Sequence, residues 1–270
     1  MQNAATSSRH LSPALWCGLA AFAAAIGLGL IQLQLATVPL TMFVIACLTA
    51  PFLPGLGFFL PVVSRGTTGK PLVALTFDDG PDPATTPALL ALLAQRNIRA
   101  TFFVIGWRAA KYPELIDAIL ADRHSIGNHS YRHSYVALLR GPQALRKEIT
   151  DTQKTLARFY IQPLAFRPPV GITTPGLGRV LRQLGLYAVN FRFRTFDSGN
   201  RRLRNLARFT LERARPDDIL VLHDLNPIGD RGINRWLLEV TRIVDGLEKK
   251  GLAITSLEKL IDRPVMQKIG

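Results

Sequence analysis

The feature that most restricts this chain is a long uncharged apolar stretch near its N-terminus. Residues 11–64 contain no Asp, Glu, Lys or Arg, Arg9 is the only charged side chain before Arg65, and the first carboxylate is Asp78. Such a segment is poorly suited to the surface of a water-soluble domain, whereas about 20 apolar residues suffice to cross a bilayer as a helix. The sequence therefore predicts a membrane anchor followed by a separate, charged domain.

The apolar stretch divides into two segments of membrane-spanning length. Residues 13–31 form the first, and residues 38–62 form a second that prolines and glycines interrupt in its latter half. A secretory signal has an apolar core of only about 7–15 residues and ends at a cleavage site. We therefore expect an uncleaved helical hairpin, with a signal peptide or a single span as alternatives.

Charge next to the apolar segments predicts the orientation of the hairpin. Arg9 precedes the first segment, Arg65 and Lys70 follow the second, and the connector between them carries no charge. The positive-inside rule then places both ends of the hairpin, and with them the catalytic domain, on the cytoplasmic side of a bacterial inner membrane. Export of the domain to the other side is the alternative. The net charge is +14, and the chain has no nucleic-acid-binding motif. We therefore expect membrane lipid as a partner and do not expect nucleic acid.

Both cysteines, Cys17 and Cys47, lie in the apolar stretch, so the folded domain has no cysteine nucleophile or cysteine-based zinc site.

The rest of the chain alternates between strand and helix patterns. Repeated strand–helix units predict an α/β fold with a parallel sheet, either open or closed into a barrel. In such sheets chemistry collects at the carboxyl ends of the strands. We divide the chain into an N-terminal tail (1–10), a membrane anchor (11–62), a linker (63–71) and a catalytic domain (72–270).

Two adjacent carboxylates, Asp78 and Asp79, follow the first strand of the domain in the run TFDDGP at 76–81. Neighbouring carboxylates repel each other, so a site with both ionised usually has a cation nearby. A polar turn is the plainer interpretation, because Asp-Gly-Pro sequences are also common in turns.

Three of the five histidines fall between positions 124 and 133. His129 and His133 are four residues apart, and on a helical turn both imidazoles would face one point. Two histidines and one carboxylate make a typical site for Zn²⁺ or a similar divalent ion. We expect His124, which falls in the preceding strand, to be structural.

Two further clusters follow predicted strands. Arg167 opens the run RPPVG at 167–171, where it can hold a carboxylate in bidentate fashion and where Val170 keeps a backbone N–H. His223 ends the apolar run at 219–222. A rigid turn and a structural histidine are the plainer interpretations, but together the clusters supply groups for metal binding, proton transfer and oxyanion stabilisation.

These motifs resemble, in order and spacing, those of the polysaccharide deacetylases with the nodulation-protein-B homology domain, carbohydrate esterase family 4. The runs TFDDGP, HSYRHS at 129–134 and RPPVG carry the resemblance, which covers roughly residues 71–257. It implies a distorted (β/α)7 barrel that follows the N-terminal transmembrane hairpin along the chain. It also implies a metal-dependent hydrolase that removes N-acetyl or other N-acyl groups from amino sugars of a glycan or lipid-linked saccharide.

The resemblance assigns roles to individual residues. It implies that Asp79, His129 and His133 bind one divalent metal ion, most typically zinc, with cobalt, nickel or manganese as alternatives. By the same resemblance, Asp78 is the general base and Arg167 holds and tunes it. The Val170 N–H would bind the oxyanion, and His223 would protonate the leaving amine. No Gly-x-Ser-x-Gly elbow is present, which argues against a serine esterase.

The chain departs from the family pattern at two places. Val170 replaces a usual tyrosine, and the run DSGNR at 197–201 matches an Asp-x-x-Asp-Trp motif only at Asp197, with Asn200 and Arg201 in the other positions. The departures concern the substrate pocket more than the reaction. Alternatives are a deformylase or deacetylase of a polyprenyl-phosphate-linked sugar, an O-acetyl esterase, an inactive sugar-binding module and a membrane scaffold protein.

Overall fold

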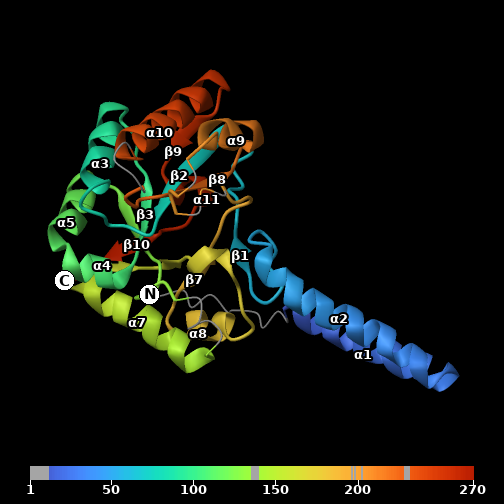
Figure 1. Ribbon diagram of the computed structural model, residues 1–270. Helices are drawn as coiled ribbons and strands as arrows, with labels where there is room; N and C mark the ends of the chain where they lie inside the picture. Colours follow the sequence, from blue (N-terminus) through green and yellow to red (C-terminus); the bar gives the residue numbers. More distant parts are fainter. Residues whose placement is uncertain (1–11, 135–139, 196, 198, 202, 228–231) are drawn as a thin grey trace.

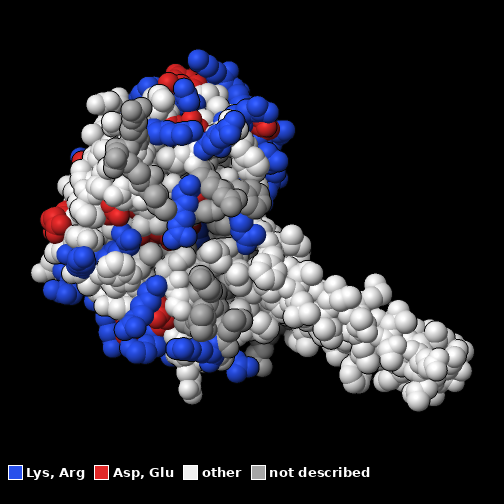
Figure 2. Space-filling model, viewed as in Figure 1, with Lys and Arg blue, Asp and Glu red and all other residues white. Residues whose placement is uncertain are grey.

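A hairpin of two apolar helices projects from an α/β domain (Figure 1). The computed structural model describes residues 12–270 except 135–139, 196, 198, 202 and 228–231. Helix α1 (Pro13–Ile31) and helix α2 (Thr37–Thr49) are joined by the short helix η1 (Leu33–Ala36), and η2 (Ala50–Phe52) continues α2. The two candidate spans, Pro13–Ile31 and Leu33–Phe52, are almost entirely unburied, and Figure 2 shows no charged side chain on their visible face.

The chain after the hairpin is part of the domain's sheet. Phe58 and Leu60 are buried, and β1 (Val62–Val63) pairs in parallel with β7 (Tyr187–Val189). The following segment is also fixed, because the Asp217 carboxylate accepts hydrogen bonds from the backbone N–H groups of Thr68 and Gly69. The sheet therefore begins inside the segment expected to be anchor and linker.

Eight parallel strands form the main sheet, in the order β1-β7-β6-β4-β3-β2-β8, with β9 also paired to β2. The remaining strands of this sheet are β2 (Leu72–Asp78), β3 (Thr101–Val104), β4 (Ser125–Asn128), β6 (Ala165–Phe166), β8 (Ile219–His223) and β9 (Ala253–Thr255). In the described residues an isolated bridge between Arg65 and Asp218, rather than a ladder, connects the region of β1 to that of β8. The expected barrel is therefore an open, curled half-barrel of seven consecutive strands.

Helices cover the outside of the curled sheet (Figure 1). They are α3 (Thr86–Gln95), α4 (Gly106–Lys111), α5 (Pro113–Ala121), α7 (Pro142–Ala157), α8 (Leu177–Gln183), α9 (Leu206–Arg213), α10 (Gly232–Lys249) and α11 (Leu257–Ile261). A separate antiparallel pair, β5 (Ile161–Pro163) with β10 (Met266–Lys268), lies outside the main sheet. Most of the longer helices and strands lie where the sequence alternates between helix and strand patterns. Five elements are too short to give a periodic signal in the sequence: β1, β5, β10, α4 and α11.

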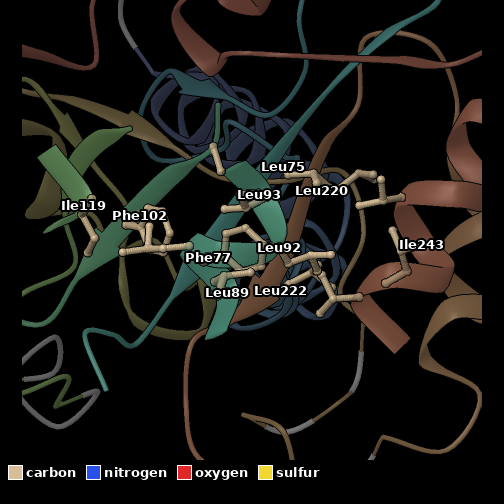
Figure 3. Close-up of a cluster of buried hydrophobic side chains, with 14 of the residues drawn as sticks. Leu75, Phe77, Leu89, Leu92, Leu93, Phe102, Ile119, Leu220, Leu222 and Ile243 are labelled. Atoms are coloured by element: carbon tan, nitrogen blue, oxygen red, sulfur yellow. The ribbon is translucent and has the colours of Figure 1, made fainter. Parts of the chain in front are cut away.

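Alternation along β2 explains how the core and the site share one strand. Leu75 and Phe77 belong to the hydrophobic cluster that packs against α3 and α10, in which Leu93 and Ile243 are also buried (Figure 3). Successive side chains of a strand point to opposite faces. Thr76 and Asp78 therefore face the inside of the curled sheet, where the polar groups gather.

Candidate active site and metal centre

The four polar clusters meet at the carboxyl ends of the parallel strands. Register brings them together, since Asp78 at the end of β2 lies opposite His223 at the end of β8. A cavity of about 550 Å³ opens there. Its lining includes the predicted site residues Asp78, Asp79, His129, His133, Val170 and His223, together with Phe191, Arg194, Thr195, Asp197, Gly199, Arg201, Val221 and Leu225. The remaining predicted residue, Arg167, lies fully buried behind Asp78.

Asp79, His129 and His133 place one ligand atom each within 4.8 Å of one another. The Asp79 Oδ1 atom lies 3.4 Å from His129 Nε2 and 3.2 Å from His133 Nε2. This carboxylate oxygen is buried and has no hydrogen-bond partner in the described chain. A buried, unpaired carboxylate oxygen facing two imidazole nitrogens is what a bound cation would satisfy. The donor set therefore fits a divalent metal ion.

The protonation states suit metal binding as well. The Nδ1 atom of His129 lies 2.7 Å from the Arg167 carbonyl oxygen, so the N–H at Nδ1 donates there and the Nε2 atom is left facing Asp79. Burial, with a further contribution from His129, lowers the pKa of His133 to about 4. Burial would raise the pKa of Asp79, but the neighbouring histidines hold it well below its usual value. At neutral pH Asp79 is thus a carboxylate and His133 a neutral imidazole.

The two metal-site histidines meet through a turn and not through a helix. Strand β4 ends at Asn128, and Ser130 and His133 have positive φ angles of 66° and 54°. Asn128 holds this turn, because its Oδ1 atom accepts the Ser130 N–H at 2.9 Å and its Nδ2 atom donates to the Ile149 carbonyl at 3.0 Å. The imidazole rings stand 4.9 Å apart. The prediction that both rings face one point is right, but the helical reason given for it is wrong.

Arg167 is the partner of Asp78. Its Nη1 atom donates to Asp78 Oδ1 at 2.6 Å and to the Thr76 hydroxyl at 2.7 Å. The guanidinium lies over the Phe103 ring at 4.0 Å, which fixes its plane. Asp78 Oδ2 lies 3.9 Å from His129 Nε2, next to the candidate metal ligands. One carboxylate oxygen is thus held by arginine, while the other faces the centre of the site.

Val170 lies at the tip of η3 (Pro169–Gly171) with φ 49° and ψ 19°. This left-handed conformation is unfavourable for a β-branched residue and is typical of functional sites. The Val170 N–H has no acceptor in the described chain, while its carbonyl accepts a hydrogen bond from Arg194 Nη2 at 2.8 Å. The loop thereby keeps a free N–H at the rim of the cavity.

His223 is paired with Asp197, a residue that the sequence placed only in a degenerate motif. The His223 Nδ1 atom lies 2.8 Å from Asp197 Oδ2. Burial would lower the pKa of His223, but the negative charge and hydrogen bond of Asp197, with smaller contributions from Asp79 and Asp78, outweigh it and raise the pKa to about 9. His223 is therefore protonated at neutral pH, with Nδ1 bonded to Asp197.

Asn200 has a positional role that the sequence did not reveal. Its Nδ2 atom donates to the backbone carbonyls of His223 at 2.9 Å and Leu225 at 2.7 Å. Between these two residues Asp224 is buried and accepts the hydroxyls of Thr85 and Thr86. The amide fastens the chain on both sides of Asp224, which a carboxylate at position 200 could not do.

His124 is structural, as expected, because its Nδ1 atom accepts the Ala100 N–H at 3.1 Å. It lies in the core, away from the residues that line the cavity.

Comparison with known proteins places the chain in a family. Residues 65–189 match the family model for polysaccharide deacetylases. A peptidoglycan-N-acetylglucosamine deacetylase of Bacillus cereus is 31% identical over 192 residues, which cover 70% of this chain and 88% of the relative. A chitooligosaccharide deacetylase of Azorhizobium caulinodans is 32% identical over 205 residues, which cover 72% of this chain and 96% of that protein.

Solved structures agree with the sequence matches. A crystal structure of a peptidoglycan N-acetylglucosamine deacetylase aligns with a TM-score of 0.69 and 28% identity, covering 76% of this chain and 94% of the other. The family 4 carbohydrate esterase of Streptomyces lividans, in complex with acetate, aligns with a TM-score of 0.59 and 32% identity over 68% of this chain and 91% of the other. The chain therefore belongs to the polysaccharide deacetylase family, carbohydrate esterase family 4, and is a hydrolase of that family.

Proposed function

We propose that this protein is a metal-dependent N-deacetylase of N-acetylglucosamine units in a glycan or glycolipid at a bacterial membrane. The observation that carries the proposal is the pairing in one cavity of the cluster Asp79, His129 and His133 with Asp78 on one side and His223 on the other. An amide needs a nucleophile, a site for its oxyanion and a proton for its leaving nitrogen, and this set offers groups for all three.

Asp79, His129 and His133 would hold the metal ion, with zinc as the first choice for this donor set. When bound, the ion supplies Lewis acidity toward water and the amide carbonyl. Asp78 then acts as general base and accepts the proton of the attacking water, which typically contributes about 10²–10⁴ in rate. Arg167 keeps one oxygen of Asp78 occupied, so that the other faces the reacting water.

The remaining steps fall to Val170 and His223. The Val170 N–H would donate to the oxyanion as the carbonyl becomes tetrahedral, and one such donor typically contributes about 3 kcal/mol. His223, held protonated by Asp197, would donate its Nε2 proton to the departing nitrogen. Nothing in this sequence of steps requires a covalent intermediate on the protein.

The substrate class follows from the relatives, which are named for N-acetylglucosamine in peptidoglycan and for chitooligosaccharides. We infer the same amino sugar here. The apolar hairpin supports a membrane location, and its flanking positive charges favour the cytoplasmic side of the inner membrane.

A polyprenyl-phosphate-linked amino sugar is the second candidate substrate, and one contact favours it. The Nη1 atom of Arg194, which lines the cavity, donates to the carbonyl of Phe52 at 2.7 Å, and Phe52 is the last residue of the second candidate span. The mouth of the cavity therefore lies close to the end of the anchor. Deformylation would use the same groups, since only the acyl substituent differs.

The test is acetate release by the purified full-length chain, supplemented with Zn²⁺, from N-acetylated chitooligosaccharides, peptidoglycan fragments and a lipid-linked N-acetylglucosamine. Acetylated xylan tests the O-acetyl esterase alternative, and the Asp78→Asn variant controls for contaminating activity. Release from N-acetylated substrates that is lost in the variant supports the proposal. Release from the ester alone, or equal release by the variant, would overturn it.

A further inference from the structure

Two arginines that line the cavity have no carboxylate partner. Arg194 and Arg201 come from the loop that follows β7, and both form part of the cavity lining. No ion pair involves either side chain within the described part of the chain. Arg192, on the same loop, is in contrast paired with Asp218 through two atoms.

Arg194 is held in position although its charge is uncompensated. Its two terminal nitrogens donate to the carbonyls of Phe52 and Val170, at 2.7 and 2.8 Å. Both are neutral acceptors, and partial burial lowers the pKa of this guanidinium. A cation that a fold keeps half-buried without a counter-ion is available to an anionic ligand.

Arg201 is exposed and enters the lining from the other part of the loop, directly after Asn200. The Asn200 amide is fixed to the backbone of His223 and Leu225, so the chain that carries Arg201 is held at the end of β8. Both arginines thus line the cavity, Arg194 through a bond to the Val170 loop and Arg201 from the segment that Asn200 fixes to the end of β8.

The carboxylates of the cavity already have partners. Asp78 is paired with Arg167, Asp197 with His223, and Asp79 faces His129 and His133. In the described part of the chain Asp79 faces no cation, and the divalent ion that it would bind would more than cancel its charge, so Arg194 and Arg201 are then in excess. A neutral N-acetylated sugar has no use for this excess, and the amine formed on deacetylation would be repelled by it.

We propose that Arg194 and Arg201 form an anion-binding subsite for a phosphate attached to the amino sugar that is deacetylated. This inference rests on the proposed function and specifies its substrate class. The guanidinium of Arg194 also binds the last residue of the membrane span, which places this subsite at the junction of the cavity and the anchor. A phosphate that links a sugar to a membrane carrier would arrive at this position, whereas a soluble sugar phosphate would reach the same arginines from water.

The experiment compares three substrates on the full-length chain in uncharged phosphatidylcholine vesicles. They are methyl N-acetylglucosaminide, N-acetylglucosamine 1-phosphate and N-acetylglucosamine linked through phosphate to a prenyl chain. The proteins are the wild type, Arg194→Gln and Arg201→Gln, with Arg204→Gln as the control, because Arg204 is exposed on the same loop but does not line the cavity. The readout is kcat/KM for each phosphorylated substrate divided by that for the neutral one.

The expected ratio exceeds one in the wild type, falls about tenfold in Arg194→Gln and in Arg201→Gln, and is unchanged in Arg204→Gln. Damage to the Val170 loop by the Arg194 substitution would slow all substrates alike and leave the ratio intact. A preference for the prenyl-linked substrate over the soluble phosphate identifies a membrane carrier, and equal values identify a soluble sugar phosphate. A wild-type ratio of one, or a ratio that Arg201→Gln does not change, would overturn the proposal.

Binding gives a second readout that depends on neither metal nor turnover. Calorimetry with N-acetylglucosamine 1-phosphate is carried out on the same proteins after removal of divalent ions, so that phosphate cannot bind a metal. If the wild type binds N-acetylglucosamine 1-phosphate, Arg201→Gln does not, and no substrate is deacetylated, the subsite proposal is supported and the proposed function is rejected. Deacetylation without arginine-dependent binding or preference would retain the function and reject the subsite.

Discussion

Replacing Asp197 by asparagine removes the charge that keeps His223 protonated while preserving the shape of the side chain. The Asp197 Oδ2 atom lies 2.8 Å from His223 Nδ1 and is buried. An asparagine oxygen can still accept the N–H at Nδ1, so the ring keeps its orientation. The main change is electrostatic: Asp197 makes the largest contribution to the pKa of about 9, so without its charge the pKa of His223 falls toward the ordinary value of 6.5.

The size of the effect follows from the protonated fraction of His223. With a pKa of about 9 nearly all of the wild-type histidine is protonated at pH 7.5, whereas with a pKa of 6.5 only about one-tenth is. If His223 donates the proton to the leaving nitrogen, kcat/KM at pH 7.5 falls about tenfold in Asp197→Asn. At pH 6 the two proteins differ by less than about twofold, because His223 is mostly protonated in both.

The assay is the pH dependence of kcat/KM for deacetylation between pH 5.5 and pH 10, with the released amine measured by fluorescamine. The sign is fixed by the acid role: activity decreases as pH rises through the pKa of His223, so a lower pKa moves the alkaline limb to lower pH. A constant ratio of the two proteins at every pH would mean that Asp197 only orients His223. An unchanged alkaline limb would refute the assignment of His223 as the acid.

Three further changes test other parts of the site. His129→Ala should abolish stoichiometric binding of a divalent ion, as measured by plasma emission spectrometry on the dialysed protein; full occupancy would reject the metal-site assignment. Asp78→Asn should retain the metal but lose at least about 10²-fold in kcat, and near-wild-type turnover would show that Asp78 is not the base. Asn200→Asp should lower the free energy of unfolding by about 1–3 kcal/mol, because it loses the donors to His223 and Leu225 and sets a carboxylate against their carbonyls. A thermal melt checks this, and an unchanged Tm would show that these hydrogen bonds contribute little.

The orientation of the hairpin is tested with C-terminal fusions to a reporter active only in the cytoplasm and to one active only outside. The positive-inside rule predicts a signal from the first. A signal from the second alone would place the catalytic domain outside and exclude a sugar carried on the inner leaflet.

Features that depend on short-range pattern could be predicted from the amino-acid sequence. Uncharged length predicted the two apolar helices, because hydrogen bonding within each helix and an apolar surface are local properties. Alternating strand and helix patterns predicted the parallel α/β domain. The spacing of His129 and His133 after a strand end indicated a candidate metal site with one carboxylate, and the family resemblance implied Asp79 as that carboxylate. Chemical type and position in the motif were sufficient for these residues.

The tertiary structure decided the features that depend on contacts between distant segments. Pairing of Val62 and Val63 with β7 brings the chain that follows the apolar hairpin into the sheet, although a two-residue strand has no periodicity to detect. Asp197 reaches His223 only because the loop that follows β7 and the end of β8 meet at the carboxyl edge of the sheet. The Arg194 guanidinium bridges the end of the apolar hairpin, at Phe52, and the Val170 loop through backbone carbonyls. Every residue carries a carbonyl, so these contacts leave no signal in the sequence.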